Sequence, residues 1–350
     1  MDKQLPVAWN DIPSVYLHPA LLLSIMKASG QYENWLHMNF INVYASVYEK
    51  GDLLYRNGYL KLFYESTAPQ ELHSFFRIKE WNVWSISAVE KNIYATIDEN
   101  EYVLLDLDEF YIQGTYYYHR VHYFRRFLFW GYHKEKAIFY TISHDKFTKL
   151  SNFYIHKENV LEALVGRLDG EKIPNGSNSI GLSIKLKTGL FQQIPYNPYS
   201  IYLQLLKYHD GYQITRATRT DDADTTDYFG FILYDLLIDR IQQSLKNIVK
   251  YDYRAIGMLV EQKAGLARRL EYLSKQTGCN TFDSSIYEFR VMSEDARKIL
   301  LQLLRYGSSD DNVRQRVGDI CIKKLQEIRE KDRLTVDKLL ISLENIPEHN

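Results

Sequence analysis

The hydrophobic pattern of this 350-residue chain changes near residue 220, and that change constrains the fold more than any other feature. Before this point, short apolar runs alternate with turn residues. The clearest runs are EYVLLDLDEFYI (101–112), FRRFLFWGYH (124–133) and KAIFYTI (136–142). Short apolar runs bounded by turns predict strands. We therefore expect an antiparallel sheet that contains residues 102–111 and 123–142.

After this point, apolar residues recur at helical spacing. The first stripe consists of Phe229, Leu233, Leu237, Ile241, Leu245 and Ile248, and the second of Ile256, Leu259, Leu266, Leu270 and Leu273. Further helices fit 295–306, 312–329 and 335–344. Stripes of this kind are typical of helices that pack on a core, so the C-terminal region is predicted to be a helical bundle.

One earlier helix is expected within HPALLLSIMKASG (18–30), where Pro19 suits a first turn and Gly30 a C-terminus. Its apolar residues predict that it is buried. The fold class is therefore α+β. We expect an α+β domain over residues 1–215, with an antiparallel sheet and a buried N-terminal helix, and a helical region over 216–350 packed on it.

Charge and composition exclude several functions. Lys and Arg total 43 against 44 Asp and Glu, so no global field favours nucleic acid or anionic lipid as a partner. No apolar run reaches the roughly 18 residues of a membrane span. The two cysteines, Cys279 and Cys321, provide no disulfide framework, and the N-terminus does not resemble a signal peptide, so we expect a cytoplasmic protein. Phosphate-loop, dinucleotide, zinc-protease and serine-hydrolase motifs are absent from the sequence, and we expect no cofactor.

The segment 116–133, YYYHRVHYFRRFLFWGYH, holds three histidines, three arginines and nine aromatic residues. His119 and His122 lie three apart in a stretch with strand character, which directs their side chains to opposite faces, so we expect no metal site. Asp106 and Asp108 share a face of the preceding strand. We expect them to contact solvent or the basic residues of 119–126.

The order of these pieces resembles the papain-like proteins of the butirosin type, which transfer acyl and amide groups in antibiotic and nonribosomal-peptide pathways. The matching segments are HPALLLSIMKASGQYENWLHMNF, VLLDLDEFYI, HYFRRFLFWGY, AIFYTI, YFGFILYDLL and DYRAIGMLVEQKAGLARRLEYL. Together they cover most of the chain. The resemblance implies a papain-like fold for the first domain.

The resemblance also implies a thiol at the start of the early helix, an imidazole on a strand and a carboxylate that orients it. In this sequence the helix start reads Tyr16-Leu17-His18-Pro19 and contains no cysteine. The strand reads Arg125-Arg126 where the histidine is expected, with His122 just before it. The carboxylate position falls near Ser143, with Asp145 just beyond.

Three functions remain open at this point. The first is a degenerate family member that binds a carrier-tethered acyl or peptide intermediate, or a partner enzyme of the pathway. The second is an active transferase without covalent catalysis, in which His122 or His18 is the general base, assisted by Asp145, in a cleft that also contains Ser24. The third is a helical-bundle interaction protein without an active-site cleft.

For the first function we expect the segment 116–133 to form one wall of the cleft, with Tyr132 among its binding residues. Arg125 and Arg126 are neighbours on a strand and point to opposite faces, so one of them should face the cleft. A guanidinium there binds a phosphopantetheine phosphate, a carboxylate or an acidic helix of a partner. The two cysteines are predicted to be dispensable.

Overall fold

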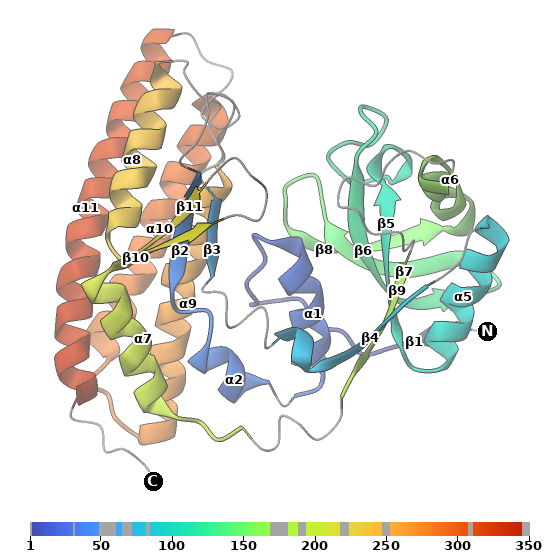
Figure 1. The fold of residues 1–350 in the computed structure, drawn as a ribbon, viewed down its shortest axis with the longest axis horizontal. Helices are drawn as coiled ribbons and strands as arrows, with labels where there is room; N and C mark the ends of the chain where they lie inside the picture. The colour runs from blue at the N-terminus through green and yellow to red at the C-terminus, as the bar shows by residue number, and fades with distance from the viewer. Residues whose placement is uncertain are drawn as a thin grey trace. The chain divides into compact units, whose positions relative to one another are not determined.

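The computed structural model describes residues 2–30, 32–48, 61–64, 72–81, 85–168, 181–187, 194–217, 224–246, 253–306 and 311–344 (Figure 1). The stretch GEKIPNGSNSIG (170–181), whose Gly, Pro, Asn and Ser residues predict a loop, lies outside the described residues except for Gly181. The chain forms two compact units: unit 1 is Met1–Glu33 with Gln70–Ile194, and unit 2 is Asn34–Pro69 with Pro195–Asn350. Each unit is therefore discontinuous, whereas the sequence suggested a single boundary after residue 215.

Unit 1 contains a seven-stranded sheet in which every described pairing is antiparallel. Its strands are β1 (Asp2–Gln4), β4 (Phe76–Glu80), β5 (Tyr102–Asp108), β6 (Phe124–His133), β7 (Ile138–His144), β8 (Leu150–His156) and β9 (Gly181–Leu186). The order is β4-β9-β5-β6-β7-β8, and β1 pairs with β6. The predicted antiparallel sheet is confirmed, and a short 3-10 turn, Glu109–Tyr111, ends the first predicted strand.

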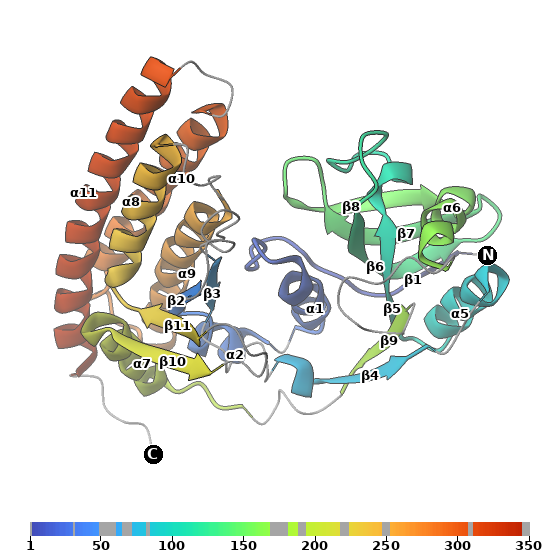
Figure 2. The same ribbon diagram turned by 45° about the horizontal axis from the view of Figure 1, so that its top comes forward.

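Among the residues that the structure describes, three helices cover this sheet: α1 (Leu17–Ala28), α5 (Ile86–Asp98) and α6 (Lys157–Leu168). In both views α1 lies on one side of the sheet, while α5 and α6 lie on the other (Figures 1 and 2). All seven residues from Ala20 to Met26 of α1 are buried, as its apolar sequence predicts. The N-terminus of α1 has no side-chain cap, whereas the Ser85 hydroxyl caps α5 by accepting from the Ala88 amide.

The pairing of β5 with β6 decides which polar side chains meet on the sheet. Asp106 lies opposite Arg126, and Asp108 lies opposite Phe124. Because side chains alternate along a strand, Asp106 and Asp108 share one face, while Arg125 and Arg126 belong to opposite faces. This register places two carboxylates and one arginine on the side of the sheet that α1 covers.

Unit 2 combines a small antiparallel sheet with a helical bundle. The sheet has the order β10-β11-β2-β3 and consists of β2 (Val43–Tyr48), β3 (Lys61–Tyr64), β10 (Tyr212–Ala217) and β11 (Asp224–Phe229). The helices are α2 (Glu33–Met38, whose first residue belongs to unit 1), α7 (Pro198–Asp210), α8 (Ile232–Leu245), α9 (Arg254–Thr277), α10 (Asp283–Tyr306) and α11 (Asp311–Glu344). None of the described helices has an apolar stretch long enough to cross a bilayer.

The C-terminal region is helical as predicted, with two differences. It begins with the β10–β11 hairpin, which pairs with β2 from the N-terminal part of the chain. In addition, α11 is one helix of 34 residues, where the sequence suggested two. The charged residues 330–333 interrupted the apolar stripe, but they include no Pro or Gly and therefore do not break a helix.

Candidate functional site

The N-terminus of α1 carries a pair of histidines. Nε2 of His18, the second residue of the helix, lies 3.1 Å from Nε2 of His73. Their rings are stacked, with centroids 5.0 Å apart. Nδ1 of His18 is buried and has no hydrogen-bond partner among the described residues. His73 belongs to no recognisable sequence motif, so the sequence did not predict it as a site residue.

The charges of an arginine–carboxylate pair on the sheet shift the pKa of the same histidine. Arg126 donates from Nε to Asp106 Oδ1 at 2.8 Å and from Nη2 to Asp106 Oδ2 at 3.0 Å. The pKa of His18 is lowered to about 4, first by burial and then by the charges of Arg126 and His73, while the charge of Asp106 opposes them. His18 is therefore a neutral imidazole at neutral pH. We call His18, His73, Asp106 and Arg126 the α1 cluster.

A second histidine–carboxylate pair lies at the end of β5. His122 Nδ1 is 2.6 Å from Asp108 Oδ2, while Asp108 Oδ1 accepts from the backbone amides of Phe110 at 3.1 Å and Tyr123 at 3.0 Å. The Asp108 side chain is only 4% exposed, whereas that of His122 is 63% exposed. In the neutral tautomer in which Nδ1 donates to the carboxylate, Nε2 carries the lone pair that a general base needs. We call this pair the His122–Asp108 dyad.

Arg125 pairs with a different carboxylate from Arg126. Its Nε forms an ion pair with Glu109, whose side chain is fully buried. The pKa of Glu109 is raised to about 7, mainly by burial, which outweighs the opposing charge of Arg125 and hydrogen bond from the Tyr117 backbone; the charge of Asp108 also raises it. The two arginines therefore belong to opposite faces, as predicted, but each is already bound by a carboxylate. Asp106 and Asp108 contact the basic segment, also as predicted.

Other candidate residues lie away from both histidine sites. Ser24 is fully buried and donates to the Leu21 carbonyl at 2.6 Å, within its own helix. Tyr132 is 2% exposed and donates to Asp98 at 2.6 Å, and burial raises its pKa to about 12. Neither side chain is accessible to a ligand, because each is enclosed in the core of unit 1. Ser24, His18 and His122 make no hydrogen bond to one another.

Asp145 stabilises a turn. Its Oδ1 accepts from the amides of Phe147 at 2.8 Å and Lys149 at 3.0 Å, and its Oδ2 accepts from the Ser151 hydroxyl at 2.9 Å. These three bonds close the connection between β7 and β8. All three donors lie within that connection or at its edge, so the carboxylate has a structural role and does not orient either candidate base.

Both cysteines belong to unit 2. Cys279 Sγ lies 2.7 Å from Thr281 Oγ1, in the connection between α9 and α10. Cys321 is buried in α11, and burial raises its pKa to about 11. The N-terminus of α1 therefore has no thiol. Across the described ranges there is also no group of three or more His, Cys, Asp or Glu side chains arranged to hold a metal ion.

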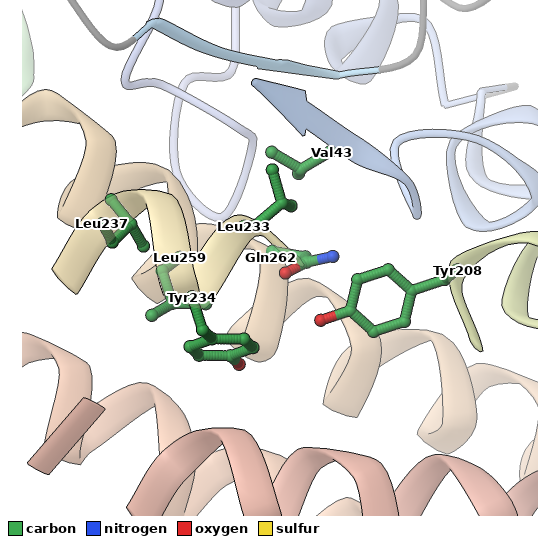
Figure 3. Close-up of a pocket in the computed structure, with 7 residues that line it drawn as sticks. All are labelled: Val43, Tyr208, Leu233, Tyr234, Leu237, Leu259 and Gln262. Carbon is green, nitrogen blue, oxygen red and sulfur yellow. The ribbon is translucent and has the colours of Figure 1, made fainter. Parts of the chain in front are cut away.

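Unit 2 contains a buried polar cluster that the sequence did not identify as such. Lys263 and Asp332 are both fully buried, and Tyr208 and Tyr234 donate to the same carboxylate. Figure 3 shows the two tyrosines with Gln262 beside a cavity of about 10 Å³. A space of this size holds at most about one water molecule. The cluster therefore belongs to the core and has no room for a substrate.

The chain matches no protein-family profile and no curated protein sequence. Its function is therefore inferred from the geometry of the two histidine sites.

Proposed function

We propose that unit 1 is a papain-like domain without a nucleophilic thiol, which binds a carrier-tethered acyl or peptidyl intermediate in specialised-metabolite biosynthesis. The observation that supports this most is the α1 cluster. A helix N-terminus presents His18 beside Arg126 and Asp106 of neighbouring strands. In the family that the sequence resembles, such a helix start carries the cysteine; here the carboxylate of the cluster, Asp106 of β5, precedes Arg126 of β6 in the chain and is not the position near Ser143 that the resemblance implies.

The chemistry of the α1 cluster favours binding over covalent catalysis. His18 is neutral because burial lowers its pKa to about 4, so it accepts a hydrogen bond but does not replace a thiolate. Arg126 stays protonated at any physiological pH, and its Nη1 donates no hydrogen bond among the described residues. The uncapped N-terminus of α1 adds a partial positive charge. Together these groups suit a thioester carbonyl, a carboxylate or a phosphate.

The partner in this proposal is an acyl or peptidyl carrier protein, or an enzyme of the same pathway, in the cytoplasm. Both cysteines are free thiols, which fits a reducing compartment. The test uses the full chain, a panel of acyl-loaded carrier proteins, calorimetry and intact-mass measurement. We expect a complex with at least one carrier and no increase in the mass of the chain.

The binding site is tested with Arg126→Gln and with the exposed Lys136→Gln as a matched control. Arg126→Gln should weaken the complex roughly tenfold or more, since it removes a charge-assisted hydrogen bond, and Lys136→Gln should not change it. A covalent acyl adduct on the chain, or equal binding by both variants, contradicts the proposal. So does the absence of binding to every carrier tested.

The His122–Asp108 dyad favours a second candidate function, a transferase that acts without a covalent intermediate. A general base with a free Nε2 accepts a proton from an amine that attacks the thioester carbonyl; the C–N bond forms, the C–S bond breaks, and the imidazolium returns the proton to the departing carrier thiolate. His122→Gln should then abolish transfer to an amine acceptor and leave carrier binding intact. Transfer that persists in His122→Gln excludes this function for the dyad.

A further inference from the structure

Unit 1 has an open surface groove of about 540 Å³ that neither candidate function uses. It is lined by Gln113, Gly114, Thr115, Tyr116, Tyr118, Arg120, Lys146 and Phe147. The loop 113–120 and the turn between β7 and β8 form it, and the Lys146 amide joins them by donating to the Gly114 carbonyl at 2.9 Å. Its volume lies within the range of about 300–1,000 Å³ that is typical of small-molecule sites.

The groove carries positive charge that the described residues do not neutralise. Arg125 and Arg126 are each paired with a carboxylate, but no ion pair involves Arg120 or Lys146 within the described part of the chain. None of the described residues that line the groove is an Asp or a Glu. Asp145, next to Lys146, is bound by the amides and the hydroxyl of its own turn. The groove is therefore complementary to an anion.

Aromatic rings accompany these two cations. Tyr116 is 50% exposed and Phe147 is 68% exposed. The guanidinium of Arg120 lies 5.5 Å from the Tyr116 ring centroid, and the Lys146 ammonium lies 5.1 Å from that of Phe147. Tyr118 is stacked on His119, with centroids 4.1 Å apart. Each cation is thus next to an exposed ring that is available to stack on a planar ligand.

We propose that this groove binds a mononucleotide: Arg120 and Lys146 hold its phosphates, and its base stacks on the exposed ring of Tyr116 or Phe147. Exposed rings bind bases of any kind, because every base has a π-face. A single nucleotide fits better than a nucleic-acid strand, because the groove is local and the whole chain has a net charge of −1. The proposal is independent of the α1 cluster.

Calorimetric titration of the full chain with ATP, GTP, AMP, adenosine and inorganic phosphate tests this proposal. ATP or GTP should bind saturably and more tightly than AMP, and AMP more tightly than adenosine or phosphate alone. Tighter binding of an acidic peptide or of a single-stranded oligonucleotide than of any mononucleotide overturns the proposal, as does binding of inorganic phosphate as tightly as ATP.

Substitutions in the groove locate the site. Arg120→Gln and Lys146→Gln should each raise the dissociation constant roughly tenfold or more, because each removes a charge-assisted contact. Phe147→Ala and Tyr116→Ala test the stack, and at least one of them should weaken binding severalfold. Lys136→Gln, which removes an exposed lysine outside the groove, should have no effect. Nucleotide binding that is unchanged in all four groove variants overturns the proposal.

Discussion

Lys263 Nζ lies 2.5 Å from Asp332 Oδ2, and neither side chain has any exposed surface. Tyr208 and Tyr234 donate to the same oxygen at 2.5 and 2.8 Å, so the carboxylate joins α7, α8, α9 and α11. Burial lowers the pKa of Lys263, and the charge of Asp332 opposes this. The ammonium also lies 5.8 Å from the Phe289 ring of α10. Lys263 and Asp332, together with the side chains that they contact, thus come from five helices of the bundle.

Lys263→Met should destabilise unit 2 by about 3–5 kcal/mol, because it leaves the Asp332 charge buried without its cation. Urea unfolding measures this change. The double variant Lys263→Met with Asp332→Leu should recover much of the loss, since it removes both charges together. A single variant as stable as the original chain would show that Asp332 does not carry a charge in the folded state.

Glu109→Gln should remove a dependence of stability on pH. The pKa of Glu109 rises from 4.5 to about 7 on folding, so the folded state binds the additional proton between these values. The stability that Glu109 contributes is therefore present below about pH 4.5 and is lost as pH rises to about 7, by up to about 1.4 kcal/mol per pH unit. The difference in unfolding free energy between the original chain and Glu109→Gln, measured across this range, should fall with rising pH. A constant difference contradicts the prediction.

His18 should remain neutral in the folded protein until the pH is well below that at which an ordinary histidine is protonated. Its pKa falls from 6.5 to about 4, mainly because it is buried. The stability that depends on neutral His18 is thus present above about pH 6.5 and is lost as pH falls towards 4. NMR titration should show no change of its ring signals between about pH 5.5 and 8. Arg126→Gln should raise its pKa but not restore it fully, since burial is the larger cause.

The cysteines should be dispensable for carrier binding. Cys279→Ser should change stability by less than about 0.5 kcal/mol, while Cys321→Ser should cost more, because Cys321 is fully buried. Neither substitution should alter the affinity for a carrier or the rate of any transfer. Loss of either property in a variant that keeps its melting temperature would show that a thiol acts in the chemistry.

The strands and the longer helices could be predicted from periodicity, because the spacing of apolar residues within a short segment indicates which face of the element is buried. β5, β6 and β7 follow that pattern, and so does the orientation of Arg125 and Arg126 to opposite faces. The carboxylates that bind these arginines depend on strand register, which a local pattern does not specify.

The features that the sequence did not predict are contacts between residues that are far apart in the chain. β11 pairs with β2, whose residues lie more than 170 positions earlier. Asp332 interrupts an apolar stripe, yet it is a core residue because Lys263 meets it from another helix. His73 likewise becomes part of a site only where α1 meets it. No short window of sequence contains both members of these pairs.

Asp108→Asn separates the structural role of this residue from its role in the His122–Asp108 dyad. Its Oδ1 accepts the amides of Phe110 and Tyr123, and an asparagine carbonyl retains both bonds. The asparagine NH₂ then faces His122 Nδ1 in place of Oδ2. A donor at that point requires Nδ1 to be the acceptor, so the ring proton moves to Nε2 and the imidazole loses the lone pair that a general base needs.

If the dyad is the base of a transferase, Asp108→Asn should lower the transfer rate by about 10²–10⁴-fold while carrier binding and the melting temperature stay unchanged. Nitrogen NMR of His122 should show the proton on Nε2 in this variant and on Nδ1 in the original chain. His156→Gln, which replaces an exposed histidine at the end of β8, is the matched control and should retain the original rate. A reversed tautomer together with an unchanged rate would show that His122 takes no proton in the reaction, and would leave binding at the α1 cluster as the function of unit 1.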